Sequence, residues 1–594
     1  MSQPPPPPPQ PPQPPQQPPQ PPQGGGGGFG PPQQPPPPGY GYPQQPAPSG
    51  YGYPGQPPAP AYGQQPGPNP YGQPTPPYGQ QLGYAYPPPH TPYPTQPIGP
   101  GGPGGGRNRT VAVVVAAVVA LALVVGGVVW FAHSSGDEGG KDDTATSGST
   151  TGGGDEKGGT DGPAVADGQE KVPADPASEV LFQVPSPKVD KDERSVVVAG
   201  SWLTDKVYAK SGIAEITGYD PGKGDELWTI PLAGPVCTVS KYVTVDNKAA
   251  VVHQPAMPTR AKPSQGCSQV TLIDLDTGRM LWSKEAKAER SGDRPMAFSN
   301  VTVSKDTVAA GGLAGGVGWD ISSGATLWSP KADDSCYDNG YGGGPKLVVV
   351  RKCGELDARQ LHIQTIDPKT GKVVSEYEMA PGIEYAAVVS TDPLVVAADV
   401  GDSAGDGSGI SDFFSLDNKT GKLRNRISAP GKNFAARCDA ISRVEQCSGL
   451  TVGNDRLYIA TEEHKGSGES YSFTNEIVVF DLATGKQTGE RADAGDGYTM
   501  TPLRMDGGDV IAYKEPPYNK GGQVVSIDGR TFEETKLLEN PATKNVRDVE
   551  TQMQPEYAEI IYSQGRLYLA AQFASALSAS DDKRYLTVAF GASG

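Results

Sequence analysis

Residues 217–231, TGYDPGKGDELWTIP, contain the phrase that decides the fold of most of the chain. An apolar run ends at Asp220, Gly224 follows four residues later, and Trp228 follows four residues after that. An Asp side chain accepts hydrogen bonds from the backbone amides just ahead of it, and glycine adopts the positive φ that a tight turn needs. The stretch therefore predicts two antiparallel strands joined by a turn.

The phrase recurs along the chain. In six copies the Asp precedes a glycine by four residues, and in the seventh Phe532 replaces the glycine. Successive Asp residues are separated by 54, 46, 47, 50, 64 and 47 residues. A period of about 50 residues, built from short strands, indicates a solenoid or a propeller. The predicted turn residues are Asp220, Gly224, Asp274, Gly278, Asp320, Gly324, Asp367, Gly371, Asp417, Gly421, Asp481, Gly485 and Asp528.

An alternating apolar strand precedes each phrase. These strands are expected at 195–200, 249–253, 308–312, 346–351, 394–398, 456–461 and 509–513, and an eighth pair at 566–571 and 584–590 lacks the turn. Eight pairs predict an all-β, eight-bladed β-propeller, with seven blades as the alternative. The last unit has only three expected strands. The early strand at 180–184 is expected to complete it, because closure leaves only short, protected edges.

Three copies carry the longer pattern Asp-x-x-x-Gly-x-x-x-Trp, which ends at Trp228, Trp282 and Trp328. This pattern resembles the repeat of the pyrroloquinoline-quinone-type (PQQ-like) β-propellers of membrane-anchored bacterial proteins, over the region from about residue 180 to residue 594. The resemblance implies that these tryptophans dock between neighbouring blades. Later copies depart from it, with Ser375, Asn425 and Gly489 at the Trp position.

The N-terminal region has a different character. Residues 1–106 contain no Asp, Glu, Lys or Arg and consist mostly of Pro, Gln, Gly and Tyr. Such a segment cannot bury enough apolar area to offset its chain entropy. We expect residues 1–109 to be a disordered spacer, with a docking strip for aromatic-lined grooves or a self-associating tail as alternatives. The net charge of −17 argues against nucleic acid as a partner.

Residues 110–132 are expected to form a transmembrane helix. The uncharged run 111–132 has 22 residues, enough at the helical rise to cross a hydrocarbon core of about 30 Å. Arg107 and Arg109 precede it and acidic residues follow, so the tail is expected in the cytoplasm and the remainder outside the cell. Residues 133–178, rich in Gly, Ser, Thr and Asp, are expected to be a flexible acidic linker to an ectodomain at 179–594.

Six cysteines lie in the expected ectodomain, and an even number outside the membrane suggests disulfides. Fifteen pairings are possible in principle. We favour the pairs that fall within adjacent strands or their loop. A metal site is the weaker alternative, because no Cys-x-x-Cys spacing occurs and His residues are sparse. The favoured pairs are Cys237 with Cys267, Cys336 with Cys353, and Cys438 with Cys447.

Several motifs suggest chemistry but lack its context. Residues 401–405 match the Gly-x-Ser-x-Gly nucleophile elbow, but the glycine-rich run that follows cannot start a stable helix. The Gly-Lys pairs at 222–223, 371–372, 421–422 and 485–486 lack the full phosphate-loop spacing. No catalytic, cofactor-binding or metal-binding residue is therefore assigned. The remaining candidates are an acidic loop that does not fit an EF-hand (Asp399, Asp402, Asp406 and Asp412) and single histidines (His253, His362 and His464).

The resemblance implies two kinds of function. Quinoprotein dehydrogenases bind pyrroloquinoline quinone and calcium on the propeller axis beside a disulfide between adjacent cysteines, which this chain lacks. Other relatives, including an outer-membrane assembly lipoprotein, use the propeller as a binding scaffold. We expect a single-pass membrane protein whose ectodomain is a binding scaffold and not an enzyme. Protein, peptide or cell-wall polymer ligands would bind at long loops such as 254–268, 401–412 and 462–474.

Two alternatives for the function remain. One is an enzyme, either a quinone-dependent dehydrogenase or a surface hydrolase. The other is a sensor that relays ligand capture to a cytoplasmic partner of the Pro-rich tail. No cofactor is assigned to any of the three.

Overall fold

The computed structural model describes residues 169–190, 195–287, 289, 294–355, 358–401, 403–404, 409–439, 441, 443–467, 472–576 and 583–592. The predicted tail with Arg107 and Arg109, the predicted transmembrane helix at 110–132, and residues 133–168 of the predicted linker lie outside this set. Within the described part of the chain, no helix combines the length and apolar character needed to cross a bilayer. Its α-helix, α1 (Lys544–Gln552), is short.

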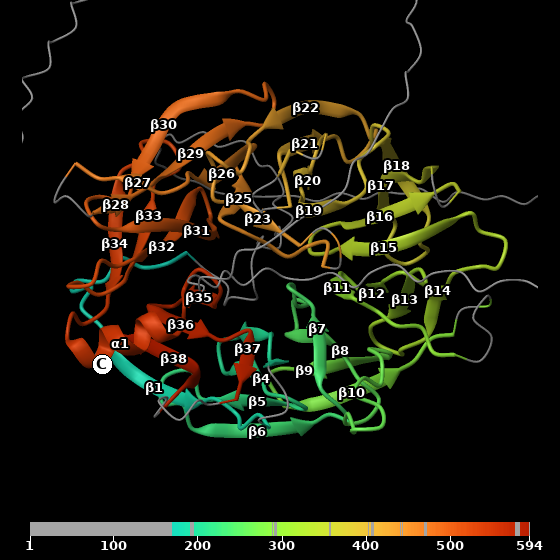
Figure 1. The fold of residues 1–594 in the computed structure, drawn as a ribbon, viewed down its shortest axis with the longest axis horizontal. Coiled ribbons are helices and arrows are strands. Elements are labelled where there is room, and N and C mark those ends of the chain that lie inside the picture. Colours follow the sequence, from blue (N-terminus) through green and yellow to red (C-terminus); the bar gives the residue numbers. More distant parts are fainter. Residues whose placement is uncertain are drawn as a thin grey trace, which may run out of the picture. The chain divides into compact units, whose positions relative to one another are not determined.

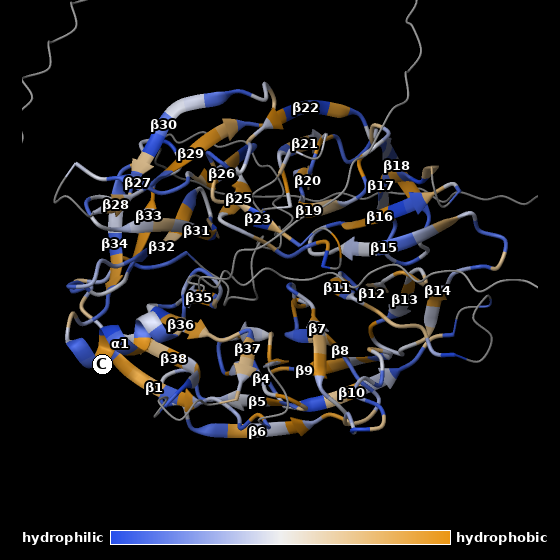
Figure 2. Cartoon of the chain, viewed as in Figure 1, coloured by the Kyte–Doolittle hydropathy of each residue, from blue (hydrophilic) through white to orange (hydrophobic). Residues whose placement is uncertain are grey.

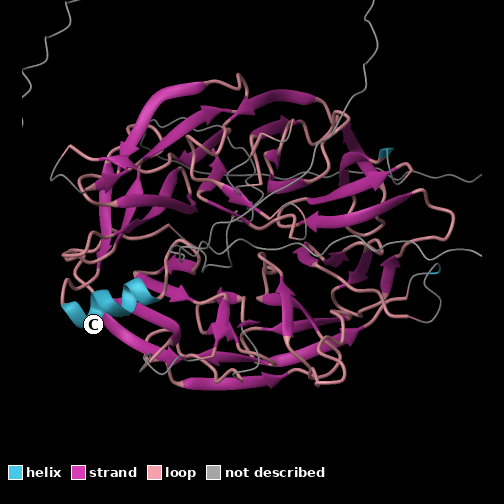
Figure 3. Cartoon of the chain, viewed as in Figure 1, coloured by secondary structure: helices cyan, strands magenta, loops and turns pink. Residues whose placement is uncertain are grey.

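Eight four-stranded antiparallel sheets are arranged around a common axis, so the fold is an eight-bladed β-propeller (Figures 1 and 3). In each blade the four strands follow one another outward from the axis, and each strand pairs with its neighbours in that order. Blade 1 contains β3 (Ser201–Leu203), β4 (Tyr208–Ser211), β5 (Glu215–Tyr219) and β6 (Glu226–Pro231), and blade 2 contains β7 (Val236–Val239), β8 (Lys248–His253), β9 (Gln269–Asp274) and β10 (Arg279–Lys284). Blade 3 contains β11 (Asn300–Ser304), β12 (Thr307–Gly311), β13 (Val317–Asp320) and β14 (Thr326–Trp328), and blade 4 contains β15 (Cys336–Gly342), β16 (Leu347–Cys353), β17 (Gln360–Ile366) and β18 (Val373–Glu378).

Blade 8 contains both the last strands of the chain and its first described strand. Blade 5 contains β19 (Ala386–Thr391), β20 (Leu394–Ala398), β21 (Asp412–Leu416) and β22 (Leu423–Ser428), and blade 6 contains β25 (Leu450–Gly453), β26 (Arg456–Ala460), β29 (Glu476–Asp481) and β30 (Gln487–Asp493). Blade 7 contains β31 (Thr499–Asp506), β32 (Asp509–Glu515), β33 (Gln523–Ile527) and β34 (Glu534–Glu539), and blade 8 contains β35 (Glu559–Ser563), β36 (Arg566–Ala570), β38 (Tyr585–Gly591) and β1 (Glu179–Pro185). Three short pairs add to these: β2 (Ser195–Val197) with β37 (Phe573–Ser575), β23 (Arg437–Cys438) with β24 (Cys447–Ser448), and β27 (His464–Lys465) with β28 (Phe473–Thr474).

The apolar core lies between the faces of neighbouring blades. The second strands β12 and β20 are buried along their whole length. In Figure 2 the third strand β29 of blade 6 is largely orange, whereas its outer neighbour β30 is mostly blue and white. Side chains of Val252 and Leu272 in blade 2, for example, share a cluster with Val301 and Val308 in blade 3. Both faces of an inner strand are covered, so its sequence is a nearly continuous apolar run.

The repeated Asp and Gly form the turn between the third and fourth strands, as predicted. Oδ1 of Asp320 accepts a hydrogen bond from the amide of Ser323 at 2.8 Å, and the amide of Gly324 donates to the carbonyl of Asp320 at 2.8 Å. Gly324 has φ +65°, and Phe532, which replaces the glycine in the seventh copy, has φ +62°. Equivalent side-chain contacts are made by Asp220, Asp274, Asp367, Asp417, Asp481 and Asp528, and positive φ by Gly224, Gly278, Gly371, Gly421 and Gly485.

Each tryptophan of the repeat lies against the turn of the next blade. A side chain at Gly278 would place its Cβ 2.3 Å from the ring of Trp228, so only glycine lets the two blades approach this closely. The indole of Trp282 donates to the carbonyl of Ile321 at 2.8 Å, and the ring of Trp328 covers Gly371. Packing between adjacent blades explains why Trp and Gly occur at a fixed spacing.

Blades that lack the tryptophan use other contacts at the same position. Ser375 donates from Oγ to the carbonyl of Asn418 at 2.7 Å, and Asn425 donates from Nδ2 to the carbonyl of Leu482 at 3.3 Å. Between blades 6 and 7 the strand residue is Gly489, and the bulky group instead comes from the turn, where the Phe532 ring lies 6.3 Å from the Tyr458 ring. A polar contact or a ring from the opposite partner replaces the tryptophan.

The early strand closes the ring, as the sequence predicts. Strand β1 pairs antiparallel with β38, with Glu179 opposite Gly591, and the Phe182 ring covers Gly224 of blade 1. Blade 8 also contacts blade 1 through the stacked rings of Tyr208 and Tyr568, 4.4 Å apart. The buried ammonium of Lys210 lies 2.9 Å from the Glu559 carboxylate in the same junction.

Two sequence predictions near the start of the ring are wrong. The strand expected at 195–200 is not part of blade 1, because β2 pairs with β37 and the inner strands of that blade are β3 and β4. Apolar residues occupy 196–199 and 202–203, separated only by Gly200 and Ser201, so the apolar pattern does not mark where the blade begins. Residues 169–178, assigned to the flexible linker, pack on blades 7 and 8.

The up-and-down strand order gives the ring two distinct ends. Turns between first and second strands, and the Asp-Gly turns, lie at one end, which we call the turn face. Connections between second and third strands, and those from blade to blade, lie at the other end, which we call the loop face. The long segments 254–268, 401–412 and 462–474 all connect second to third strands, so they belong to the loop face.

Three disulfides join the cysteines in the favoured pairing. Cys237–Cys267 ties β7 to the segment before β9, and Cys336–Cys353 joins opposite residues of β15 and β16. Cys438–Cys447 joins the two strands of the β23–β24 hairpin, which lies inside the ring (Figure 1).

Candidate functional site

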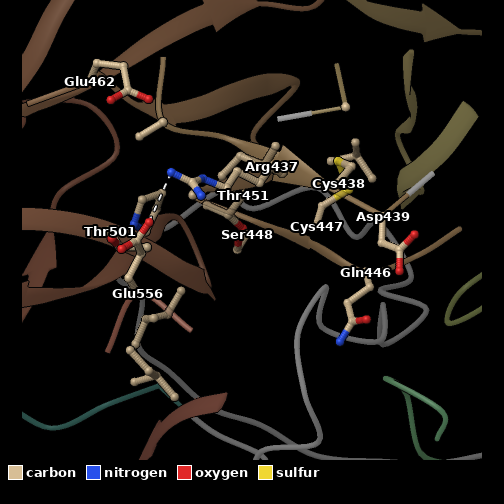
Figure 4. A pocket seen from close by; sticks show the side chains of 18 of the residues that line it. Arg437, Cys438, Asp439, Gln446, Cys447, Ser448, Thr451, Glu462, Thr501 and Glu556 are labelled. Atoms are coloured by element: carbon tan, nitrogen blue, oxygen red, sulfur yellow. Dashed lines mark ion pairs between the residues drawn. A yellow bond between two sulfur atoms is a disulfide. The ribbon is translucent and has the colours of Figure 1, made fainter. Parts of the chain in front are cut away.

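A cavity of about 1310 Å³ opens at the centre of the ring, and we call it the axial cavity (Figure 4). Its walls come mainly from blades 5–8, including Thr501 and Leu503 of the first strand β31 and Ile560 of β35. Other lining residues, such as Glu462 and Gln572, belong to loop-face connections. The cavity mouth is therefore on the loop face.

Acidic side chains dominate the axial cavity. Its lining has two cationic residues, Lys241 and Arg437, against seven carboxylates. Arg437 forms an ion pair with Glu556 at 3.0 Å, drawn as a dashed line in Figure 4. The seven carboxylates are Glu384, Asp399, Asp439, Glu462, Glu463, Glu515 and Glu556.

The charges of neighbouring glutamates raise the pKa of two of these carboxylates. Burial raises the pKa of Glu463, and the charges of Glu556 and Glu462 raise it further. Burial also raises the pKa of Glu515, to which the charges of Glu463 and Glu556 add. Clustered carboxylates resist simultaneous ionisation, so a cation placed among them is favoured.

Exposed apolar side chains occur in the lining or next to lining residues in the chain. Ile441 lines the cavity and is 63% exposed, and Tyr557, next to Glu556 in the chain, is 57% exposed. Phe573, next to Gln572, is 52% exposed. The site therefore has a negatively charged lining, with one exposed apolar residue in it and two others next to lining residues in the chain.

The structure places the sequence candidates apart from one another. Asp399 accepts hydrogen bonds from the amides of Ser403 and Ala404, whereas Asp412 is buried in β21 and pairs with Arg426 at 2.8 Å. Asp402 and Asp406 lie outside the described residues. Among the residues that are described, no three His, Cys, Asp or Glu side chains are grouped to hold a metal ion.

The histidines and the elbow serine make local contacts. His253 is buried between the Gln254 carbonyl and the Thr271 hydroxyl, each 2.9 Å away. His362 contacts Glu376, and His464 contacts Glu476 at 2.9 Å, on different blades. The Ser403 hydroxyl donates to the Val400 carbonyl at 2.9 Å. None of these contacts joins two of the candidates in one site.

The glutamates of the axial cavity were missed by the sequence analysis. Glu384 and Glu556 precede the first strands β19 and β35, Glu462 and Glu463 follow β26, and Glu515 ends β32. Their signal in the sequence is a carboxylate at the loop-face end of an inner strand. Residues 463 and 556 come together only through ring closure, which their separation in the chain does not reveal.

Pyrroloquinoline quinone, the cofactor of the quinoprotein relatives, carries several carboxylates. The axial cavity has a large excess of carboxylates over cations, and like charges placed together cost several kcal/mol. The residues that line this cavity therefore do not fit that cofactor.

Comparison with known proteins places these observations in a family. A family model described as outer membrane protein assembly factor BamB matches residues 186–336 and 268–533. No curated protein sequence matches the chain.

Solved structures with a similar fold have little sequence in common with the chain. BamB from Moraxella catarrhalis is 13% identical over 69% of this chain and 100% of its own, with a TM-score of 0.32. Quinohemoprotein alcohol dehydrogenase from Comamonas testosteroni is 13% identical over 70% of this chain and 76% of its own, with a TM-score of 0.39. A europium-containing methanol dehydrogenase is 11% identical over 70% of this chain and 93% of its own, with a TM-score of 0.39.

The family match carries the assignment, because it agrees with what the structure shows. The matched residues cover more than half of the chain and contain the repeated Asp-Gly turns of blades 1–7. The chain therefore belongs to the PQQ-like β-propeller family that this model represents.

Proposed function

We propose that the chain is a single-pass membrane protein whose propeller, outside the cell, binds a positively charged ligand in the axial cavity. The observation that carries the proposal is the lining of that cavity, with seven carboxylates and two cationic side chains in about 1310 Å³. A cleft lined by one sign of charge focuses its field and concentrates ligands of the opposite sign. The function is binding, without chemical turnover.

The ligand class follows from the two parts of the site. Lysine or arginine side chains, or the amines of a cell-wall polymer, would enter the carboxylate cluster of Glu463, Glu515 and Glu556. Apolar groups of the same ligand would contact the exposed side chains of Ile441, Tyr557 and Phe573. Interfaces commonly have aromatic residues among their anchors, and charge complementarity speeds and orients the encounter.

The binding test uses the purified full chain in detergent with a fluorescent oligolysine peptide and an oligoglutamate peptide. We expect oligolysine to bind to the unmodified chain. The triple variant Glu463→Gln, Glu515→Gln, Glu556→Gln should raise the Kd for oligolysine at least about tenfold, since interfacial charge pairs contribute about 1.5 kcal/mol or more each. Binding should also weaken with salt. Fluorescence anisotropy gives each Kd.

A control variant changes the net charge equally at exposed positions of the turn face, through Asp225→Asn, Asp306→Asn and Glu533→Gln. It should bind oligolysine like the unmodified chain. Equal weakening by the two triple variants, or equal binding of both peptides, would contradict the proposal.

The anchor is supported by the uncharged segment 111–132 and by Arg107 and Arg109 before it. Protease added to intact cells should cut in the segment 133–168 and release a fragment that contains the ring. A control digestion of lysed cells shows the fragment size. Release of the ring only after lysis would place it on the wrong side of the membrane.

A further inference from the structure

Residues 443–447, which we call the plug, cross the inside of the ring and contact the first strands of several blades. The carbonyl of Val444 accepts a hydrogen bond from the amide of Val388 in blade 5 at 2.5 Å, and the Val444 side chain covers Gly340 in blade 4. On the other side, Nε2 of Gln446 lies 3.5 Å from Oε1 of Gln572 in blade 8. The plug therefore bridges blades on opposite sides of the axis.

Glu445 forms the innermost contact of the plug. Its Oε2 accepts hydrogen bonds from the Thr302 hydroxyl in blade 3 and from the Gly343 amide in blade 4, each at 3.0 Å. The residue is 5% exposed, and its Oε1 is buried without a hydrogen-bond partner among the described residues. A buried carboxylate without an ion pair is costly to ionise.

The plug forms part of the wall shared by two cavities. Gln446 and Cys447 line both the axial cavity and a second cavity of about 180 Å³. The lining of the second cavity also includes Glu445, Asn300 and Lys241. The Cys438–Cys447 disulfide fixes the end of the plug to β23. On the side of the loop face, the axial cavity offers space into which the plug can swing.

We propose that the plug is a pH-sensitive closure between the two cavities, seated while Glu445 is protonated and released toward the axial cavity when Glu445 ionises. Release exposes the carboxylate to water and joins the two cavities. The disulfide keeps the released loop attached at both ends, so the movement is reversible.

The groups around Glu445 do not compensate its charge. Blades 3 and 4 contribute the neutral Thr302 hydroxyl and Gly343 amide, and blade 2 contributes Lys241, whose attraction is weaker than the effect of burial. Across the small cavity, Glu559 of blade 8 is already paired with Lys210. In the plug itself, Arg443 is within 3.9 Å of Asp439.

Burial is the largest influence on Glu445 and raises its pKa from 4.5 to about 7. The seated form holds its proton up to that pH, whereas the released form loses it near 4.5. The seated form is therefore favoured in acid, and the advantage is lost as pH rises from 4.5 through 7. Between pH 5 and pH 8 the equilibrium constant for release rises roughly fiftyfold by linkage, and it levels off above pH 8.

Hydrogen exchange of the full chain in detergent tests whether the plug is released as pH rises. The exchange rates to measure are those of the Gly343 and Val388 amides, which donate hydrogen bonds to the plug. After correction for the intrinsic exchange rate, we expect their protection to fall roughly fiftyfold from pH 5 to pH 8. Amides of Val308 and Ala309 in β12 do not contact the plug and should keep their protection. Their loss would indicate global unfolding instead.

Two variants complete the test. Glu445→Gln keeps the acceptor for Thr302 and Gly343 but cannot ionise, so protection at pH 8 should stay at its acid value. Glu462→Gln removes a carboxylate of the axial cavity away from the plug and should keep the pH dependence of the unmodified chain. Constant protection of Gly343 and Val388 in the unmodified chain overturns the proposal by itself, whether or not the variants fold.

Discussion

Individual residues at the junctions between blades show how an imperfect repeat builds a regular ring. Three junctions use Trp228, Trp282 or Trp328 over a glycine, whereas the junction before blade 7 uses Phe532 from the turn itself. The ring closes with Phe182, which no repeat phrase contains. The fold requires a filled junction and accepts different residues for that purpose.

Trp282→Ala should lower the free energy of unfolding by about 3 kcal/mol, because it removes a large ring and its hydrogen bond to Ile321. Urea unfolding followed by circular dichroism measures the change. The adjacent Leu281→Ala serves as a control, since this side chain is 39% exposed and should cost much less. Equal losses for both variants would show that Trp282 does not hold the two blades together.

The lowered pKa values of the turn aspartates predict that the stability of the ring decreases in acid. Hydrogen bonds from Ser323 and Ser322 lower the pKa of Asp320 from 3.8 to about 2, and the pKa of Asp220, Asp367 and Asp417 is lowered in the same way. Their folded pKa lies below the unfolded value, so their contribution is complete above pH 3.8 and is lost as pH falls toward 2. Thermal melts between pH 5 and pH 2 should show the loss, and Asp320→Asn should make it smaller. An unchanged pH profile in Asp320→Asn would contradict this reading of the turn.

At the scale of strands, much of the ring could be predicted from the sequence. Strands expected at 249–253, 308–312 and 394–398 agree with β8, β12 and β20 within a residue or two, because each is a buried apolar run before an Asp-Gly turn. The start of blade 1 could not be predicted, since only Gly200 and Ser201 separate the apolar residues at 196–199 from those of β3. Pairing between β2 and β37 depends on ring closure, which local patterns do not encode.

Strand β1 is the element on which closure depends. We compare a chain that starts at residue 169 with one that starts at residue 186 and lacks β1. The shorter chain leaves β38 as an open edge, so we expect it to associate through that edge or to melt without cooperativity. Light scattering after gel filtration and a thermal melt test this. A monomer with an unchanged melting temperature would show that β1 is dispensable.

At the scale of the whole molecule, the axial cavity could not be predicted. Its five glutamates lie at or beside strand ends of four blades, between residues 384 and 556, and only the ring brings them together. The disulfide pairs were favoured correctly because each joins residues within adjacent strands or their loop. Contacts across the axis, such as Glu445 with Thr302, have no local signature in the sequence.

A buried ion pair joins the segment before β1 to the ring. Glu170 and Arg504 lie 2.6 Å apart and are 4% and 5% exposed. Glu170→Ala leaves Arg504 with one ion pair, to Asp506, and with hydrogen bonds to the carbonyls of Met505 and Tyr562. We expect a loss of about 3 kcal/mol in the free energy of unfolding. Urea unfolding measures it, with Glu179→Gln at an exposed position as the control. A loss below about 0.5 kcal/mol would show that the pair is not required.

The place where Glu170 binds has a mechanical consequence. Asp506, Gln564 and Gly565, which contact Glu170, lie in turns of the turn face, whereas the cavity opens on the loop face. Any pull that reaches the ring through its N-terminal segment meets Glu170 before it meets β1. The load is thus shared between blades 7 and 8, and it does not peel away the strand that holds the circle together. A ligand held on the opposite face could transmit tension through the propeller without opening it.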